Sequence, residues 1–295
     1  MRQGFNRPRI LSGLAVGYLL CAVPASGIAA DVSAWDNDIR SSVRLIGARA
    51  LGESGGRVLR AGVEFKLQPG WKTYWRYPGD SGVPPVFDFA ASDNVKTVTV
   101  LWPAPVRFAV GGGHSIGYKG DVTMSLRIVP QDEKKPVTLR LKLDYAVCEK
   151  LCVPATAKAE LALTGVVGTQ EAALRAAEAR VPKPGAWGDG PSLMLRKVWR
   201  DTASANPRVL VDVAAPAGAE VDLFAEGPTP DWALPLPAPV VIENRGGTAA
   251  GTRRFAFELD GLPAGAKPDG ASIKLTATAD QRTGQEAIEV VFRLD

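Results

Sequence analysis

The run VTLRLKLDYAVCEKLCVP, residues 137–154, decides how the first half of this chain folds. Up to Val147 its apolar residues occupy every second position, and polar residues fill most of the positions between them. Because successive side chains of a strand point to opposite faces of a sheet, this alternation predicts a half-buried strand over residues 137–147. A second alternating run follows, so we expect a returning strand over residues 157–163 and a long hairpin.

Two cysteines stand at the head of this predicted hairpin. Cys148 and Cys152 are separated by three residues, and a strand without a bulge would place Cys148 on its polar face. A disulfide needs Cβ atoms about 3.5–4.5 Å apart, whereas residues four positions apart in an extended strand lie about 13 Å apart along the chain. A bond between the two cysteines therefore requires a turn or a bulge between them.

Three uses of the cysteine pair fit the sequence: thiol–disulfide exchange, a structural disulfide, and metal binding. A structural disulfide would close so short a loop that the chain-entropy argument gives it only about 2 kcal/mol. Soft thiolates with one imidazole would suit Cu(I), but the single histidine, His114, lies in a glycine-rich run typical of solvated loops. We therefore expect exchange, without a metal or a cofactor. The alternative is a non-catalytic binding or copper-handling module whose disulfide is structural.

Residues 1–29 have the pattern of a cleaved export signal. Three arginines precede an apolar run that ends near Val23, and small residues up to Ala29 offer a cleavage site. The third cysteine, Cys21, lies inside this signal, and Leu20 stands where a lipoprotein signal needs a small residue. No later stretch reaches the 18 or so apolar residues of a membrane span. We expect a periplasmic protein, soluble after signal cleavage, in a compartment where cysteine pairs can oxidise.

The composition excludes several classes of function. The chain has 35 basic and 31 acidic residues, and without the signal arginines the mature chain is nearly neutral. No basic stripe with interleaved aromatic residues is present, so we expect no nucleic-acid partner. A single histidine makes catalytic triads and zinc hydrolase sites improbable.

Short alternating runs between glycines and prolines predict an all-β chain with two β-sandwiches, the second one smaller. A helix is expected only over residues 170–180, where alanine, leucine, glutamate and arginine favour it. Prolines follow it and indicate a domain boundary. We therefore divide the mature chain into a redox domain (30–166), a helical linker (167–187) and a second β-sandwich domain (188–295). Further strands are expected at 43–50, 58–67, 95–102 and 122–129, and then at 192–198, 209–214, 220–225, 240–243, 253–259, 272–278 and 287–294.

The second half contains no cysteine or histidine. Its simplest interpretation is a scaffold or docking module. In the first half, the aromatic cluster at residues 71–77 allows a carbohydrate-binding face as a non-enzymatic alternative, but core packing or a wall for the cysteine site explains that cluster equally well.

Three motifs carry a resemblance to a known family. Cys-x-x-x-Cys-x-Pro follows a strand that ends in tyrosine, GWKTYW occupies residues 70–75, and GYKGDVTM occupies residues 117–124. Together they resemble the periplasmic N-terminal domain of the thiol:disulfide interchange protein family DsbD, and more closely the ScsB (suppressor of copper sensitivity) branch. The resemblance covers about residues 35–165, and the second half is similar, with weaker signals, to the extra β domain of the ScsB branch.

This resemblance implies an immunoglobulin-like sandwich and a protein-disulfide reductase or exchange component, with a connection to copper tolerance. Cys148 and Cys152 would be the catalytic pair, with Cys148 as the sulfur joined to partners. Electrons would come from a membrane-embedded thiol donor and pass to thioredoxin-like or other disulfide-containing periplasmic clients. DsbD and ScsB continue into membrane helices and a thioredoxin-like domain that this sequence lacks, so we expect the donor to be a separate protein.

The resemblance also implies residues around the cysteine pair. In that family a loop that carries a phenylalanine caps the disulfide, and Phe108 has the matching position before the Gly-Tyr motif. Arg107 stands beside it, where DsbD has acidic residues. Tyr74, Tyr145 and Tyr118 are the implied wall residues. For Tyr74 and Tyr145 a purely packing role is an equal alternative.

Overall fold

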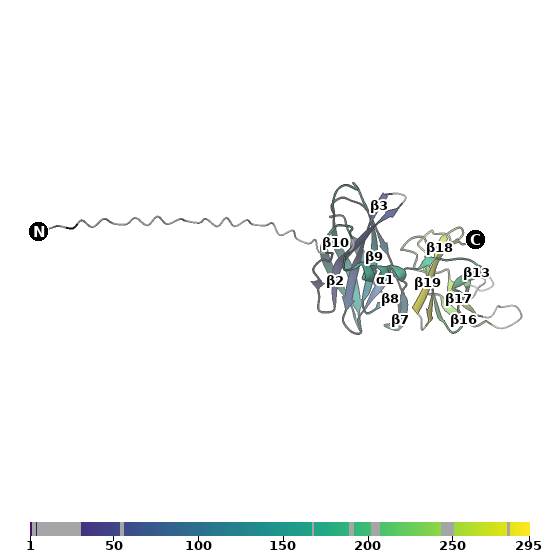
Figure 1. Cartoon of the computed structure of the whole chain (residues 1–295). Helices are drawn as coiled ribbons and strands as arrows, with labels where there is room; N and C mark the ends of the chain where they lie inside the picture. The colour runs from purple at the N-terminus through teal and green to yellow at the C-terminus, as the bar shows by residue number, and fades with distance from the viewer. Residues whose placement is uncertain are drawn as a thin grey trace.

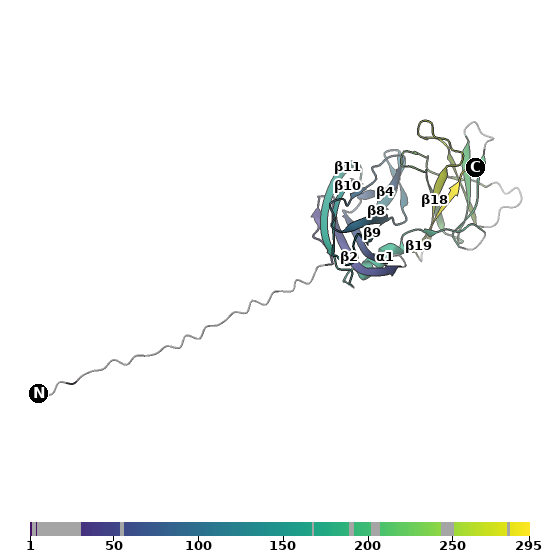
Figure 2. The same cartoon turned by 90° about the horizontal axis from the view of Figure 1, so that it is seen from above.

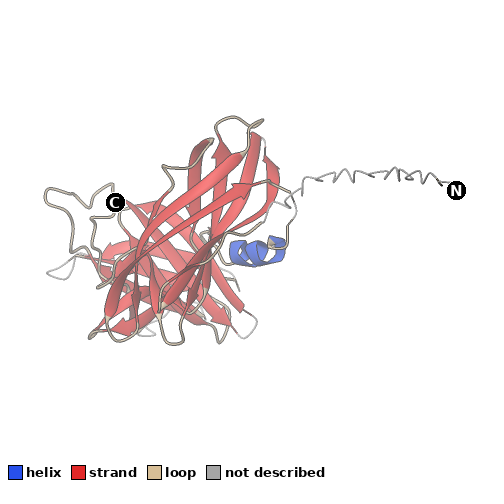
Figure 3. Ribbon diagram, turned by 90° about the vertical axis from the view of Figure 1, so that its left-hand side faces the viewer, coloured by secondary structure: helices blue, strands red, loops and turns tan. Residues whose placement is uncertain are grey.

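The computed structural model describes residues 31–53, 56–166, 168–188, 192–201, 207–242, 251–281 and 284–295, together with Met1 and Gly4. The expected export signal and Cys21 lie outside these residues. The described part contains four β-sheets and one short helix, which stands out in blue beside the red strands of Figure 3. None of its helices has the length and apolarity that a bilayer crossing requires. The predicted all-β fold class, with two successive sandwiches, is confirmed (Figures 1 and 2).

The first sandwich consists of two facing sheets, with strand orders β1-β2-β3-β9-β6 and β11-β10-β4-β8-β7, and β5 also pairs with β10. The strands of the first sheet are β1 (Asp36–Asn37), β2 (Ser41–Glu53), β3 (Gly56–Leu67), β9 (Val122–Pro130) and β6 (Val95–Leu101). Those of the second are β11 (Cys152–Leu163), β10 (Val137–Cys148), β4 (Lys72–Gly79), β8 (Gly113–Lys119), β7 (Val106–Val110) and β5 (Val86–Asp88).

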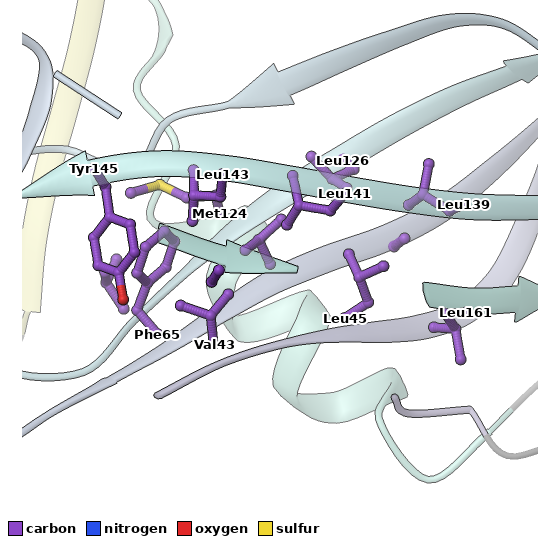
Figure 4. Packing of buried hydrophobic residues seen from close by; sticks show 14 of the residues in the cluster. Val43, Leu45, Phe65, Met124, Leu126, Leu139, Leu141, Leu143, Tyr145 and Leu161 are labelled. Carbon is purple, nitrogen blue, oxygen red and sulfur yellow. The ribbon is translucent and has the colours of Figure 1, made fainter. Parts of the chain in front are cut away.

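The alternating residues of β10 supply one side of the core, as the sequence predicts. Leu139, Leu141 and Leu143 are nearly or fully buried, and Figure 4 shows them facing Val43 and Leu45 of the opposite sheet. Fully burying one such side chain contributes about 1.5–3 kcal/mol relative to leaving it exposed. The inner face of β10 is thus fixed by packing, which also fixes what its other face presents.

The hairpin β10–β11 pairs without interruption from Val137 opposite Leu163 to Cys148 opposite Cys152. The returning strand therefore begins at Cys152, whereas the alternation predicted a start at residue 157. Small and polar residues at the start of β11 hide its strand character, but the ladder continues through them. The predicted turn between the cysteines is residues 149–151.

The single described helix, α1 (Glu171–Ala179), lies within one residue of its predicted limits. Leu174 is fully buried against Ile46 of the first sheet. The guanidinium of Arg60, on β3, donates to Glu171 at 2.7 Å and to Glu178 at 2.8 Å. Helix α1 therefore packs on the first sandwich over most of its length.

The second sandwich has strand orders β12-β19-β18-β15 and β13-β14-β17-β16. Its strands are β12 (Lys183–Pro184), β13 (Met194–Asp201), β14 (Arg208–Ala214), β15 (Glu220–Glu226), β16 (Ala238–Val240), β17 (Thr252–Glu258), β18 (Ser272–Gln281) and β19 (Gly284–Arg293). The division of the chain at residues 166 and 187 stays a prediction.

The second sandwich closes one end of the first. Phe224 of β15 is buried in the core of the first sandwich, with its ring centroid 5.8 Å from that of Trp75. Arg76 donates to Glu226 at 2.7 and 2.8 Å, and the Tyr77 hydroxyl donates to the Leu234 carbonyl at 2.6 Å. Apolar and polar contacts therefore join β4 of the first sandwich to β15 and to the segment that follows β15.

Candidate functional site

The two cysteines end the hairpin on opposite strands. Cys148 is the last residue of β10, Cys152 is the first of β11, and the two are direct cross-strand partners. In the turn between them, the Glu149 N–H donates to the Leu151 carbonyl at 3.4 Å. Cross-strand partners have Cα atoms about 4.5–5.5 Å apart, within the usual disulfide range of about 4.4–6.8 Å. Both are free thiols in this structure, and the ladder holds them where a bond can form.

The two thiols differ in exposure. Cys148 is fully buried and Cys152 is exposed. Cys148 lies on the same face of β10 as Lys142 and Asp144, as the sequence predicts. At this end of the strand, however, that face is apolar and not polar. There the face is covered by an apolar group that we call the outer cluster: Tyr74, Phe108, Ala146 and Cys148.

Tyr74 connects the outer cluster to the exposed cysteine. Its hydroxyl lies 2.8 Å from the Cys152 sulfur, and its ring centroid lies 6.4 Å from that of Phe108. A Cβ atom on Gly82 would lie 2.6 Å from the Tyr74 ring, so only glycine fits over it. A Cβ atom on Gly117 would lie 2.0 Å from the Thr73 carbonyl oxygen, so glycine also permits the close approach of β8 to β4. The position of Tyr74 thus depends on two glycines.

The surroundings of Cys148 and Tyr74 favour their protonated forms. Burial raises the pKa of the Cys148 thiol and the hydrogen bond with Cys152 adds to this, against opposing effects from Tyr74 and Lys72. Burial, followed by hydrogen bonds with both cysteines, raises the pKa of Tyr74 far above its ordinary value of 10.0. Because the thiolate is the nucleophile, this shift lowers the fraction of Cys148 that can attack at a given pH.

Two of the four expected cap and wall residues do not reach the cysteines. Tyr145 and Tyr118 point into the main core on the opposite face of the sheet, where Tyr145 shares a hydrogen bond of 2.7 Å with Ser41. The Tyr118 hydroxyl donates to the Pro103 carbonyl at 2.9 Å. The structure thus brings together Cys148, Cys152, Tyr74 and Phe108. Strand parity could have excluded Tyr145 from the wall of the cysteine site, because Tyr145 lies an odd number of positions from Cys148 and therefore on the opposite face.

Sequence reasoning missed Lys72, although it stands in the GWKTYW motif. Lys72 is the cross-strand partner of Cys148, and its ammonium nitrogen lies 5.9 Å from the centroid of the Phe108 ring. It is the cation that opposes the rise in the Cys148 pKa. Pairing the GWKTYW motif with the strand that ends at Cys148 would have placed Lys72 opposite that cysteine.

The copper and carbohydrate alternatives gain no support from the geometry. His114 is exposed and, by strand alternation, points away from the face that carries Ser115 and Phe108. Over the described residues, no three histidine, cysteine or acidic side chains form a group that could hold a metal ion. In the aromatic cluster at residues 71–77, Tyr74 and Trp75 are fully buried and cannot stack on a sugar ring, whereas Trp71 and Tyr77 are half-buried.

The comparisons with known proteins agree with this geometry. Residues 53–164 match the family described as "Thiol:disulfide interchange protein DsbD, N-terminal". The crystal structure of the N-terminal periplasmic domain of ScsB from Proteus mirabilis has a TM-score of 0.66 and 19% identity, over 90% of this chain and 99% of that chain. A conserved domain protein from Bacillus anthracis covers 91% of this chain and 92% of its own at 8% identity, and its TM-score of 0.24 says nothing about the fold.

No curated protein sequence matches the chain. At 19% identity the ScsB structure shows the fold alone. Residues 53–164 therefore carry a thiol–disulfide interchange module similar to the DsbD N-terminal domain, in a chain that has the fold of the ScsB periplasmic domain.

Proposed function

We propose that this protein is a periplasmic thiol–disulfide interchange protein that relays electrons through Cys148 and Cys152. It takes them from a membrane-embedded thiol donor and passes them to oxidised thioredoxin-like or other disulfide-containing clients. The similarity to periplasmic domains and the expected export signal support this location. One observation carries the proposal: the paired thiols lie at an exposed hairpin tip, with one cysteine exposed and the other under an apolar cover.

The difference in exposure suggests different roles for the two cysteines. The resemblance implies that Cys148 joins partners, whereas the geometry favours Cys152. Cys152 is open to solvent, whereas Cys148 is fully buried. We therefore assign Cys152 as the sulfur that joins partners and Cys148 as the one that resolves the mixed disulfide. Phe108 is the cap of Cys148, and Tyr74 is the wall that contacts Cys152.

The exchange with a client moves two electrons in two steps. The Cys152 thiolate attacks one client sulfur, forms a mixed disulfide, and the second client sulfur leaves as a thiolate. The Cys148 thiolate then attacks the Cys152 sulfur, the bond to the client breaks, and the first client sulfur leaves. The two protons lost by the cysteines end on the two client thiols. A dithiol donor reverses both steps and restores the reduced pair.

Single-cysteine variants test both the function and the order. A purified oxidised thioredoxin-like protein is mixed with Cys148→Ser or with Cys152→Ser, and mixed disulfides are separated without reductant. We expect Cys148→Ser to accumulate the mixed disulfide and Cys152→Ser to form little. The reverse result would restore the order that the resemblance implies.

The reduction potential of the wild-type pair, measured against glutathione, separates exchange from a structural disulfide. We expect a value above about −300 mV, because structural disulfides typically lie below it. A lower value together with no mixed disulfide from either variant would leave a structural disulfide as the better account.

A further inference from the structure

Strand β7 presents its two faces to different parts of the molecule. Phe108 points to the outer face, into the cluster that covers Cys148. Arg107 is the residue just before Phe108 and therefore points to the opposite face, where its strand partner on β8 is the core residue Ile116. Among the strands that the structure describes, β7 pairs only with β8, and it lies on the side of the first sandwich that faces the second (Figure 1). An edge strand of this kind has one ladder fewer to hold it than a central strand.

The second sandwich supplies the missing support through Arg107. The guanidinium donates to the two carboxylate oxygens of Asp222, on β15, at 2.7 and 3.1 Å. It also donates to the backbone carbonyls of Leu223 at 3.2 Å and Pro237 at 2.9 Å. The side chains of Arg107 and Asp222 are only 19% and 27% exposed. Two-pronged pairs between arginine and carboxylate are among the stronger hydrogen bonds, and partial burial reduces their screening by solvent.

The same strand of the second sandwich also binds β4, which carries the other wall of the site. Trp75 follows Tyr74 and packs against Phe224, while Arg76 is bonded to Glu226. Both residues that line the cysteine pair, Tyr74 and Phe108, are therefore chain neighbours of residues held by β15. The second sandwich contains no cysteine of its own, and this contact gives it a role at the site of the first.

We propose that the second sandwich, through the Arg107–Asp222 pair, holds β7 so that Phe108 stays over Cys148, and thereby directs exchange to Cys152. This rests on the proposed function above. In the oxidised protein a donor thiolate bonds to the Cys152 sulfur, the Cys148–Cys152 bond breaks, and the electron pair leaves with the Cys148 sulfur. That sulfur takes up the proton that the attacking thiol lost. Attack on Cys148 would need the space that Phe108 fills.

The structure offers a matched control for this pair. Arg254 donates to Asp212 at 2.6 and 2.8 Å with the same two-pronged geometry, and both residues belong to the second sandwich. Asp222→Asn removes the charge that holds β7, and Asp212→Asn removes an equivalent charge that holds only the second sandwich to itself. Phe108→Ala removes the cover directly and sets the rate expected for an open Cys148.

The experiment measures alkylation of the reduced, full-length variants by N-ethylmaleimide, with modification at each cysteine quantified by mass spectrometry. In the wild type we expect Cys152 to react much faster than Cys148. In Asp222→Asn we expect the Cys148 rate to rise about tenfold, the factor that corresponds to losing about 1.4 kcal/mol of a charge-assisted interaction. The Cys152 rate should stay near its wild-type value, and Asp212→Asn should behave as the wild type does.

Two outcomes would overturn the proposal. If Phe108→Ala raises the Cys148 rate and Asp222→Asn does not, the cap holds without help from the second sandwich. If Phe108→Ala itself changes nothing, Phe108 is not the cover. Should Asp222→Asn fail to fold, Arg107→Lys decides with the same measurement, because it keeps the charge and loses the two-pronged bond. Alkylation needs no partner, so a protein that trapped no client could still show the effect, and the two proposals fail separately.

Discussion

The two faces of the sheet that contains β10 carry tyrosines with different partners. On the inner face, Tyr145 shares a hydrogen bond of 2.7 Å with Ser41, and Tyr118 donates to a backbone carbonyl. On the outer face, the Tyr74 hydroxyl lies 2.8 Å from the sulfur of Cys152. The inner tyrosines bind groups of the scaffold, whereas the outer one contacts the group that we propose reacts. Strand parity decides which face a side chain takes, and here it separates the tyrosines that pack in the core from the one beside the proposed reacting sulfur.

A substitution on the inner face of β10 should have the greatest effect, and that effect should be on stability. Leu141 is buried in the inner face of β10, so Leu141→Ala should lower the free energy of unfolding by about 2–5 kcal/mol, measured by urea denaturation. The ratio of alkylation rates at Cys148 and Cys152 should not change, because the outer cluster keeps all of its members. A changed ratio at native conditions would mean that the two faces are not independent.

Two matched substitutions compare the faces directly. Tyr145→Phe leaves the Ser41 hydroxyl without its buried partner, and should cost about 1–3 kcal/mol of stability without changing the reduction potential of the pair. Tyr74→Phe removes the contact with Cys152 and keeps the ring in the outer cluster. It should therefore change the potential measured against glutathione while costing less stability. An equal shift of the potential in Tyr145→Phe and Tyr74→Phe would mean that the inner face also acts on the cysteine pair.

The smallest expected effect is on the pH dependence of the covered thiol. Burial raises the pKa of Cys148 above its ordinary value of 9.0, so its alkylation rate should still rise about tenfold per pH unit as pH passes 9.0. The same thiol in urea-unfolded protein should level off near that pH. The sign for stability follows: the contribution of the neutral thiol is fully present below the unfolded pKa and is lost as pH rises through the folded one. A native rate that levels off below pH 9 would contradict this account.

The strands that the sequence predicted are the ones with regular alternation. β2, β3, β6, β9 and β10 lie close to their expected ranges, and β11 includes its expected range but begins earlier, at Cys152. One face of each strand packs in a core, which leaves a period of two in the sequence. In the first sandwich, the short strands β1 and β5 were missed, and so were β4, β7 and β8. β7 has only five residues, β4 ends in proline and glycine, and β8 needs Gly117 for its approach to β4.

Two of these missed strands, β4 and β7, carry the walls of the site, which explains what the sequence could and could not predict about it. The cysteine pair and its turn followed from spacing. Phe108 and Tyr74 came from the resemblance alone, because no local pattern places β4 and β7 beside β10. The burial of Cys148 could not be predicted, since it depends on residues that are contributed by other strands. The contact between Arg107 and Asp222 joins positions 115 residues apart and leaves no pattern in either neighbourhood.

The direct opposition of Cys148 and Cys152 has a consequence for the lifetime of any complex. The ladder from Val137 to Cys148 holds the sulfur that we propose resolves beside the one that we propose attacks. The effective concentration of Cys148 at a mixed disulfide would therefore be set by the fold rather than by diffusion. Resolution becomes an intramolecular step that needs little backbone movement. A client would therefore remain covalently attached only briefly, and the protein would turn over by short encounters instead of stable association.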